Sequence, residues 1–135
     1  MYNNILVPIS FDADRDSAGA ISVAQQMLND GGTIRLLHVT EVLPAYAVHQ
    51  VPQEYIAEAQ VNVSNRLEEL SSPIAGCVTE IANGHAGRAI ADVAAKHDSD
   101  LVIVASHRPG MQNLLLGSTA THAVRHVHCA VHVLR

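Results

Sequence analysis

Aromatic and basic side chains are both scarce in this chain of 135 residues. It has one Phe, three Tyr and no Trp, and eight Lys and Arg stand against thirteen Asp and Glu. Proteins that stack bases need several aromatic rings, and proteins that follow a nucleic-acid backbone need clustered cations. We therefore expect no nucleic-acid partner.

Long hydrophobic runs are also missing. None approaches the roughly 20 apolar residues that a membrane helix requires, and the N-terminus lacks the charged start and apolar stretch of a signal peptide. The sequence favours a soluble, cytoplasmic protein with no membrane partner. Only two cysteines occur, Cys77 and Cys129, without a Cys-x-x-Cys spacing, so we expect two small buried hydrophobic residues in a reducing compartment.

Apolar residues make up 48% of the chain, which is enough for one core and predicts a single domain over residues 1–135. Apolar runs that are typical of buried strands alternate with stripes of helical spacing. We predict strands at residues 4–10, 33–39, 77–83, 101–106 and 129–135, with the very apolar fourth run in the centre of the sheet. We predict helices at residues 20–28, ended by the glycines 31 and 32, then 56–70 after Pro52, 90–97 and 117–127.

This alternation predicts an α/β fold with right-handed crossovers. The architecture that fits best is an open, doubly wound, Rossmann-like parallel sheet of five strands in the order 3-2-1-4-5, with helices on both faces. Ligands of such sheets bind beyond the carboxyl ends of the strands, where the winding reverses. That point lies between the first strand, expected to end at Ser10, and the fourth, expected to end at Ser106.

Several stretches carry a resemblance to a known family: "NILVPIS" at the start, "LLHV" after the first helix, "NGHAGRAIADVAAKHDSDLVIVASHRPG", and "LLLGSTATHAVRHVHCAVHVLR" at the end. Together they resemble the universal stress protein family over essentially the whole chain, and the last part is similar to its short bacterial members of the F/G type. The resemblance implies an ATP-binding protein of stress tolerance, holding ATP, AMP or ADP with Mg²⁺. It also implies a homodimer through the last strand, with a tetramer as a further option.

The sequence departs from the family's nucleotide-binding pattern of three spaced glycines, the last followed by Ser or Thr. Ala105 and Arg108 occupy the first two glycine positions, and the spacing to Gly117 is one residue short. Residues "SHRP" in this place are similar to the F/G type. Ser10 stands where the family usually has Asp, and the sequence leaves open whether Asp12 replaces that residue.

The segment between the fourth strand and the last helix predicts a phosphate site. Gly117 lets a phosphate approach the backbone, and the first N–H groups of the helix, with the hydroxyls of Ser118 and Thr119, form an anion site unless they only cap the helix. Arg108 adds a planar cation, and His107 a second donor. The resemblance adds an adenine slot at the ends of the first two strands. The predicted nucleotide-binding residues are Pro8, Ile9, Ser10, Val39, Ala105, Ser106, His107, Arg108, Gly110, Gly117, Ser118 and Thr119.

Catalytic groups are not evident in the sequence. Lys96 is the only lysine, so no Walker lysine follows the glycines. We predict no catalytic residues and at most a slow ATP hydrolysis. A dimeric adaptor of the same fold that binds no nucleotide is the alternative, since Ala105, Arg108 and Ser10 all depart from the family pattern.

Nine histidines are an unusual number for this length. His122 and His126 are four residues apart and share a helix face, a spacing found in zinc sites and also on solvated helices, and we expect no metal site. His132 lies in the strand that would pair across a dimer, where protonation would place a charge. His38 and His97 are expected to be partly buried and hydrogen-bonded. The last strand would leave an open edge, which favours the homodimer.

Overall fold

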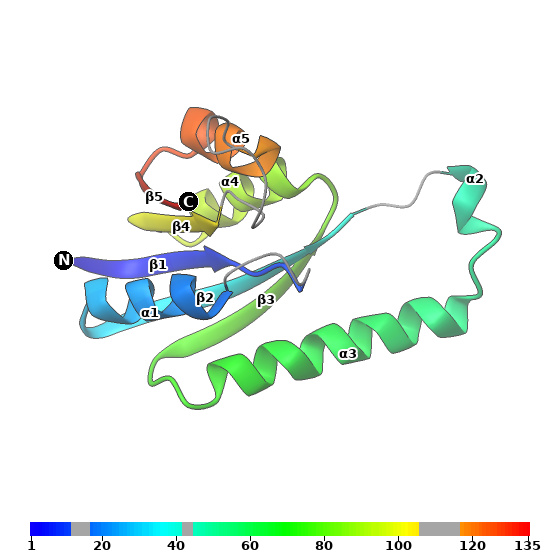
Figure 1. The fold of residues 1–135 in the computed structure, drawn as a ribbon, viewed down its shortest axis with the longest axis horizontal. Helices are drawn as coiled ribbons and strands as arrows, with labels where there is room; N and C mark the ends of the chain where they lie inside the picture. The colour runs from blue at the N-terminus through cyan, green and yellow to red at the C-terminus, as the bar shows by residue number, and fades with distance from the viewer. Residues whose placement is uncertain (12–16, 42–44, 106–116) are drawn as a thin grey trace.

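The computed structural model describes residues 1–11, 17–41, 45–105 and 117–135, and these form a parallel sheet between two layers of helices (Figure 1). The sheet has five strands in the order β3-β2-β1-β4-β5, which confirms the predicted architecture. The elements are β1 (Tyr2–Pro8), α1 (Ser17–Met27), β2 (Leu28–Thr40), α2 (Ala45–Val48), α3 (Gln53–Ser71), β3 (Cys77–Asn83), α4 (Ala86–Lys96), β4 (Leu101–Ala105), α5 (Ser118–His126) and β5 (Ala130–Leu134).

Two apolar cores lie on the two faces of the sheet. Alternate residues of β1 point to opposite faces, as strand geometry requires: Ile5 and Val7 pack with α1 and α3, and Leu6 packs with α4 and α5. Figure 1 shows α1 and α3 on one side of the strands and α4 and α5 on the other. The winding therefore reverses between β1 and β4.

The sheet opens at its carboxyl edge at this reversal. Pairing between β1 and β4 joins Ile5 to Leu101 and Leu6 to Val102, and it reaches neither Pro8 nor Ala105 at the strand ends. Pairing of β4 with β5, in contrast, continues to Ala105. The early end of the β1–β4 ladder leaves a space between the last residues of these two strands.

The predicted end of the first helix is wrong. The helix ends at Met27, and Leu28, predicted to lie on the helix, begins β2 instead and is the β-sheet partner of Tyr2. The glycines sit inside the strand, at a shift in its register with β1: Gly31 has φ +80°, and a Cβ on Gly32 would lie 2.9 Å from the carbonyl oxygen of Asn3. They permit an irregular, close strand pairing instead of ending a helix.

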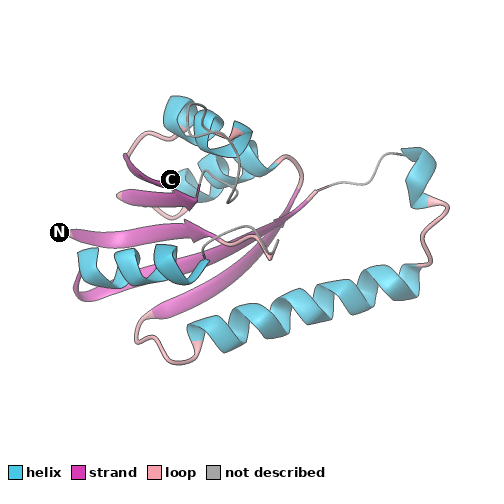
Figure 2. Cartoon of the chain, viewed as in Figure 1, coloured by secondary structure: helices cyan, strands magenta, loops and turns pink. Residues whose placement is uncertain are grey.

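The segment before α3 also differs from the prediction. The short helix α2 lies in the expected loop, and Pro52 is the residue before the first turn of α3. Figure 2 shows that α2 and the first half of α3 extend past the sheet. Ala59, expected on the buried stripe, is therefore exposed, whereas Leu67 near the other end is buried.

Three smaller predictions are corrected by the sheet. The fourth strand is an interior strand, but β1 holds the central position. The first strand ends at Pro8, before Ser10. Cys77 and Cys129 are free thiols as expected but only half-buried: Cys77 begins the edge strand β3, and Cys129 directly precedes the edge strand β5.

Candidate functional site

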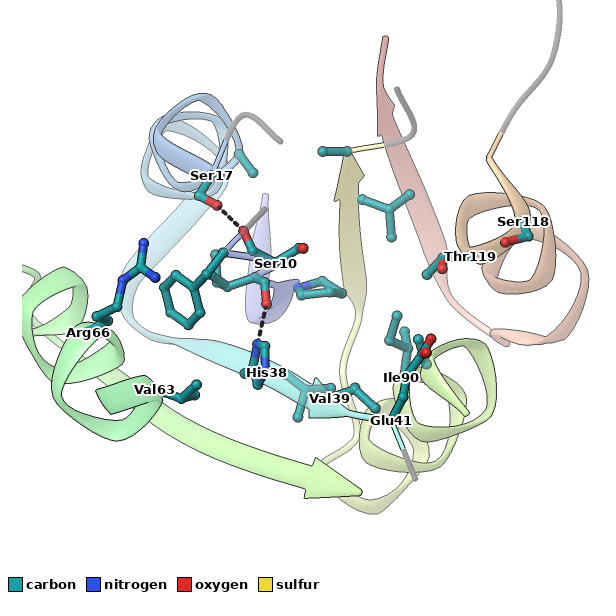
Figure 3. A pocket seen from close by; sticks show the side chains of 18 residues that line it. Ser10, Ser17, His38, Val39, Glu41, Val63, Arg66, Ile90, Ser118 and Thr119 are labelled. Atoms are coloured by element: carbon teal, nitrogen blue, oxygen red, sulfur yellow. Dashed lines mark hydrogen bonds between the residues drawn. The ribbon is translucent and has the colours of Figure 1, made fainter. Parts of the chain in front are cut away.

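A cavity of about 640 Å³ opens at the carboxyl edge of the sheet, at the reversal between β1 and β4 (Figure 3). This volume lies within the usual range of small-molecule sites. Helices α1, α4 and α5 each begin at its wall, so three positive ends of helix dipoles border the same space. The lining residues are Pro8, Ile9, Ser10, Phe11, Ser17, Ala20, Leu37, His38, Val39, Glu41, Val63, Arg66, Ala86, Ile90, Val104, Ala105, Ser118 and Thr119.

Most of the described residues that were predicted from the sequence to bind a nucleotide line this cavity. They are Pro8, Ile9, Ser10, Val39, Ala105, Ser118 and Thr119. Gly117 lies one residue away from the wall, as the N-cap of α5. The remaining nominated residues, Ser106, His107, Arg108 and Gly110, lie outside the described residues.

The start of α5 forms one end of the cavity. Its N-cap, Gly117, has no side chain, and the first turn receives no side-chain cap bond from the residues that the structure describes. Ser118 and Thr119 line the cavity instead of capping the helix (Figure 3). The first N–H groups of α5 therefore keep their capacity to donate to an anion.

An apolar slot lies between this end and the strands. Val39 closes it from β2, Ile90 from α4 and Val104 from β4. Ile90 and Val104 are 1% and 2% exposed and belong to the core on that face, so this wall is held by tertiary packing. Such a surface suits the flat face of a heterocyclic base.

The opposite end of the cavity was missed by sequence reasoning. His38 Nδ1 lies 3.0 Å from the carbonyl oxygen of Ile9, and because a carbonyl only accepts, Nδ1 carries the proton. The ring of Phe11 lies 5.3 Å from that of His38, and Arg66 Cζ lies 4.1 Å from the Phe11 centroid. These three side chains form a layered wall on the α1 and α3 side, with Arg66 labelled beside Val63 in Figure 3.

No local sequence pattern joins Phe11, His38 and Arg66, because they come from a loop, a strand and a helix. The partial burial and hydrogen bonding that the sequence predicted for His38 are confirmed. The same prediction is confirmed for His97, whose Nε2 lies 3.0 Å from Glu80 Oε1. Arg66 and Glu41 are the cationic and the carboxylate side chain in the described wall of the cavity, and both are exposed.

The histidines of α5 lie next to this site. His122 and His126 share a helix face as predicted, with ring centroids 4.1 Å apart. Within the described part of the chain, no group of three or more His, Cys, Asp or Glu residues is arranged to hold a metal ion.

Comparisons with known proteins agree with this fold. The profile of the universal stress protein family matches residues 1–135. The chain belongs to that family. It is 26% identical over 142 aligned positions to universal stress protein G of Salmonella typhimurium, covering 100% of both chains.

Solved structures of the family share its backbone. The universal stress protein UspA from Lactobacillus plantarum superposes with a TM-score of 0.80 at 23% identity, covering 99% of this chain and 98% of its own. The universal stress protein from Archaeoglobus fulgidus in complex with dAMP superposes with a TM-score of 0.68 at 16% identity, covering 99% and 98%. At these identities the likeness establishes the fold. No helix within the described ranges is both long and apolar enough to cross a membrane.

Proposed function

We propose that this universal stress protein binds an adenine nucleotide in the cavity between β1 and β4. The observation that carries the proposal is the start of α5, which receives no side-chain cap bond from the described residues and opens into a cavity that also has a packed apolar slot. One end suits a phosphate, and the neighbouring slot suits a base. Structures of family members hold AMP, dAMP or cAMP, which supports the same class of ligand here.

The phosphates would lie at Gly117, Ser118 and Thr119, where backbone N–H groups and hydroxyls donate to anionic oxygens. Adenine would lie against Val39, Ile90 and Val104. The backbone of Pro8 and Ile9, with Ser10, would border the sugar. Ala105 would contribute to phosphate binding, together with Ser106, His107, Arg108 and Gly110, which lie outside the described residues, and Mg²⁺ would accompany ATP or ADP.

With a nucleotide bound, this protein would act in the cytoplasm as a nucleotide-dependent binding module of the stress response. Any hydrolysis of ATP would be too slow to be its main purpose. β5 is an edge strand and pairs only with β4 within the described chain. We propose that this edge joins two copies in a homodimer, because an open edge of this kind is a template for strand pairing. The same edge supports the second candidate, a dimeric adaptor without nucleotide.

The first test is the nucleotide content of the purified protein. The protein is denatured and filtered, and the supernatant is compared with ATP, ADP and AMP by anion exchange. Titration calorimetry with Mg-ATP and AMP follows on nucleotide-free protein. A stoichiometric adenine nucleotide or saturable binding supports the proposal, whereas an empty supernatant and flat titrations support the adaptor.

A charge substitution then locates the phosphates. Ser118→Asp favours the helix, because an acidic residue in the first turn is stabilising by about 0.3–1 kcal/mol. The same carboxylate would repel a phosphate at this end, so AMP binding should weaken at least about tenfold, while binding of uncharged adenosine persists. Ser64→Asp, on the exposed part of α3, is the matched control and should leave both ligands unaffected. Equal weakening of AMP and adenosine binding would place the phosphates elsewhere.

A further inference from the structure

Three imidazole rings lie in series where α4 meets α5. The ring centroid of His85, the N-cap of α4, is 5.4 Å from that of His122 on α5. The ring of His126, one turn further along α5, is 4.1 Å from that of His122. These three side chains, the histidine stack, connect the start of α4 with the middle and the end of α5 (Ser118–His126), and both helices line the cavity.

His85 holds the start of α4 only in its unprotonated form. Its Nδ1 accepts a hydrogen bond of 3.3 Å from the backbone N–H of Arg88. An imidazolium ring has a proton on both nitrogens and cannot accept. Proton uptake at His85 Nδ1 would therefore remove the side-chain cap of α4.

His122 is fixed in the middle of the stack by close packing. It lies against Gly87, where even one added carbon would be too close: a Cβ on Gly87 would lie 2.6 Å from His122 Cγ. Its Nδ1 is shielded from solvent and has no hydrogen-bond partner among the described residues.

The surroundings of His122 disfavour its protonation. Burial is the largest cause that lowers its pKa from the ordinary 6.5, followed by His126 on its own helix and by His85 and Arg88 from α4. A hydrogen-bonding interaction with the backbone of Gly87 is the smallest of these causes, and it raises the pKa of His122. The neutral stack is therefore the state in which α4 and α5 fit together.

The stack lies one helical turn from the cavity. Ala86, directly after His85, lines the cavity from α4. Ser118 and Thr119, four and three residues before His122, lie on the same side of α5 and line the cavity from there. A change in the contact between α4 and α5 would move both of these walls.

We propose that His122 is a positioning residue for the ligand site, and that the neutral histidine stack holds the first turns of α4 and α5 in the arrangement that binds the nucleotide. Proton uptake by the stack breaks the α4 cap and places like charges beside one another, which separates the start of α4 from α5 and releases the ligand. This inference rests on the proposed function, and it adds that acidification regulates the site.

The test measures affinity against pH with cAMP. Its phosphodiester keeps one charge throughout, whereas the phosphate of AMP titrates near pH 6 and would obscure the effect. Where one proton and the ligand exclude each other, the dissociation constant rises by up to about tenfold for each pH unit below the pKa of the group that takes up the proton. For the wild-type chain we expect the dissociation constant for cAMP to rise as the pH falls from 7.5 to 5.

Two variants remove the titrating groups and keep their structural roles. His85→Asn retains a side chain that caps helices well and does not titrate, and His122→Leu fills a similar space without a charge. Each should flatten the pH dependence of cAMP affinity. His128→Gln, at an exposed position outside the stack, is the control and should keep the wild-type profile.

A ring-proton NMR titration separates this inference from the proposed function. We expect His122 to titrate below pH 6.5, and its pKa to rise in a variant that carries His85→Asn and His126→Gln. Absence of cAMP and AMP binding at every pH would refute the proposed function and with it this inference. Binding with a pH-independent or acid-strengthened cAMP affinity, or profiles that stay steep in both variants, would overturn the inference alone.

Discussion

The close approach of Gly87 on α4 to His122 on α5 gives a prediction whose size follows from the structure. Gly87→Ala would place a methyl group 2.6–2.8 Å from three atoms of His122, which is closer than any stable carbon contact. The clash involves a side chain that is itself held by His85 and His126, so it cannot swing away freely. Overpacking of this kind costs about 1–3 kcal/mol, and the better helix propensity of alanine returns up to about 1 kcal/mol.

The net loss should be about 1–2 kcal/mol of unfolding free energy, or a fall of about 3–7 °C in Tm for a domain of this size. Urea unfolding and thermal unfolding at neutral pH measure it. The double variant Gly87→Ala with His122→Ala should cost about 1–2 kcal/mol less than the sum of the two single variants, because the methyl group then occupies the vacated space. Additive losses, or an unchanged Tm in Gly87→Ala, would refute the packing argument.

Three further predictions concern stability. The free energy of unfolding should fall as the pH drops below about 6.5. The pKa of His122 is lowered in the folded state, chiefly by burial, so below that pH the unfolded chain binds the proton more readily than the folded chain does. His122→Leu should weaken this fall in a series of urea titrations at different pH values. Glu80→Gln should cost about 1 kcal/mol in urea unfolding, because Oε1 lies 3.1 Å from Arg35 Nη1 and 3.0 Å from His97 Nε2, whereas exposed Glu58→Gln should cost nothing measurable. Ile103→Ala removes a fully buried side chain and should lower stability by about 2–5 kcal/mol in the same assay, and a loss below about 1 kcal/mol would show that the core can close around the space.

The architecture was predictable because it depends on patterns that repeat along the chain. The third strand was predicted at residues 77–83 and found there, since a glycine turn precedes it and a helix start follows it. Gly31 and Gly32 misled the same reasoning because a glycine pair marks a helix end and a strand irregularity alike. Pairing with the first residues of β1 decides between the two, and no local pattern contains that information.

The residues of the candidate site also fall into two groups, those that local sequence patterns or the family resemblance predict and those that only tertiary contacts determine. Val39 and Ala105 were predicted through the family resemblance, and they line the cavity because the ends of parallel strands meet at one edge of the sheet; Ser118 was predictable because it begins a helix there. Arg66 was not predictable, since its place beside Phe11 depends on where α3 crosses the face of the sheet. The spacing of His122 and His126 indicated a shared helix face, but no local pattern indicates that His85 completes the stack.

The two sides of the cavity differ in how firmly they are held, and this difference bears on function. Ile90 and Val104 belong to a buried core, so the slot between them is rigid and suits the part of the ligand that all nucleotides of one base share. Arg66 and Glu41 are exposed charges on the opposite side and at the rim, where substitution costs little stability. Under the proposed function, recognition of the base would therefore depend on residues that the fold itself requires, whereas Arg66 and Glu41 could be substituted to alter the preference for ligand charge at little cost in stability. The histidine stack stands between these cases: it is packed firmly enough to position two walls of the cavity, and its imidazole rings can take up a proton when the solution is acidified.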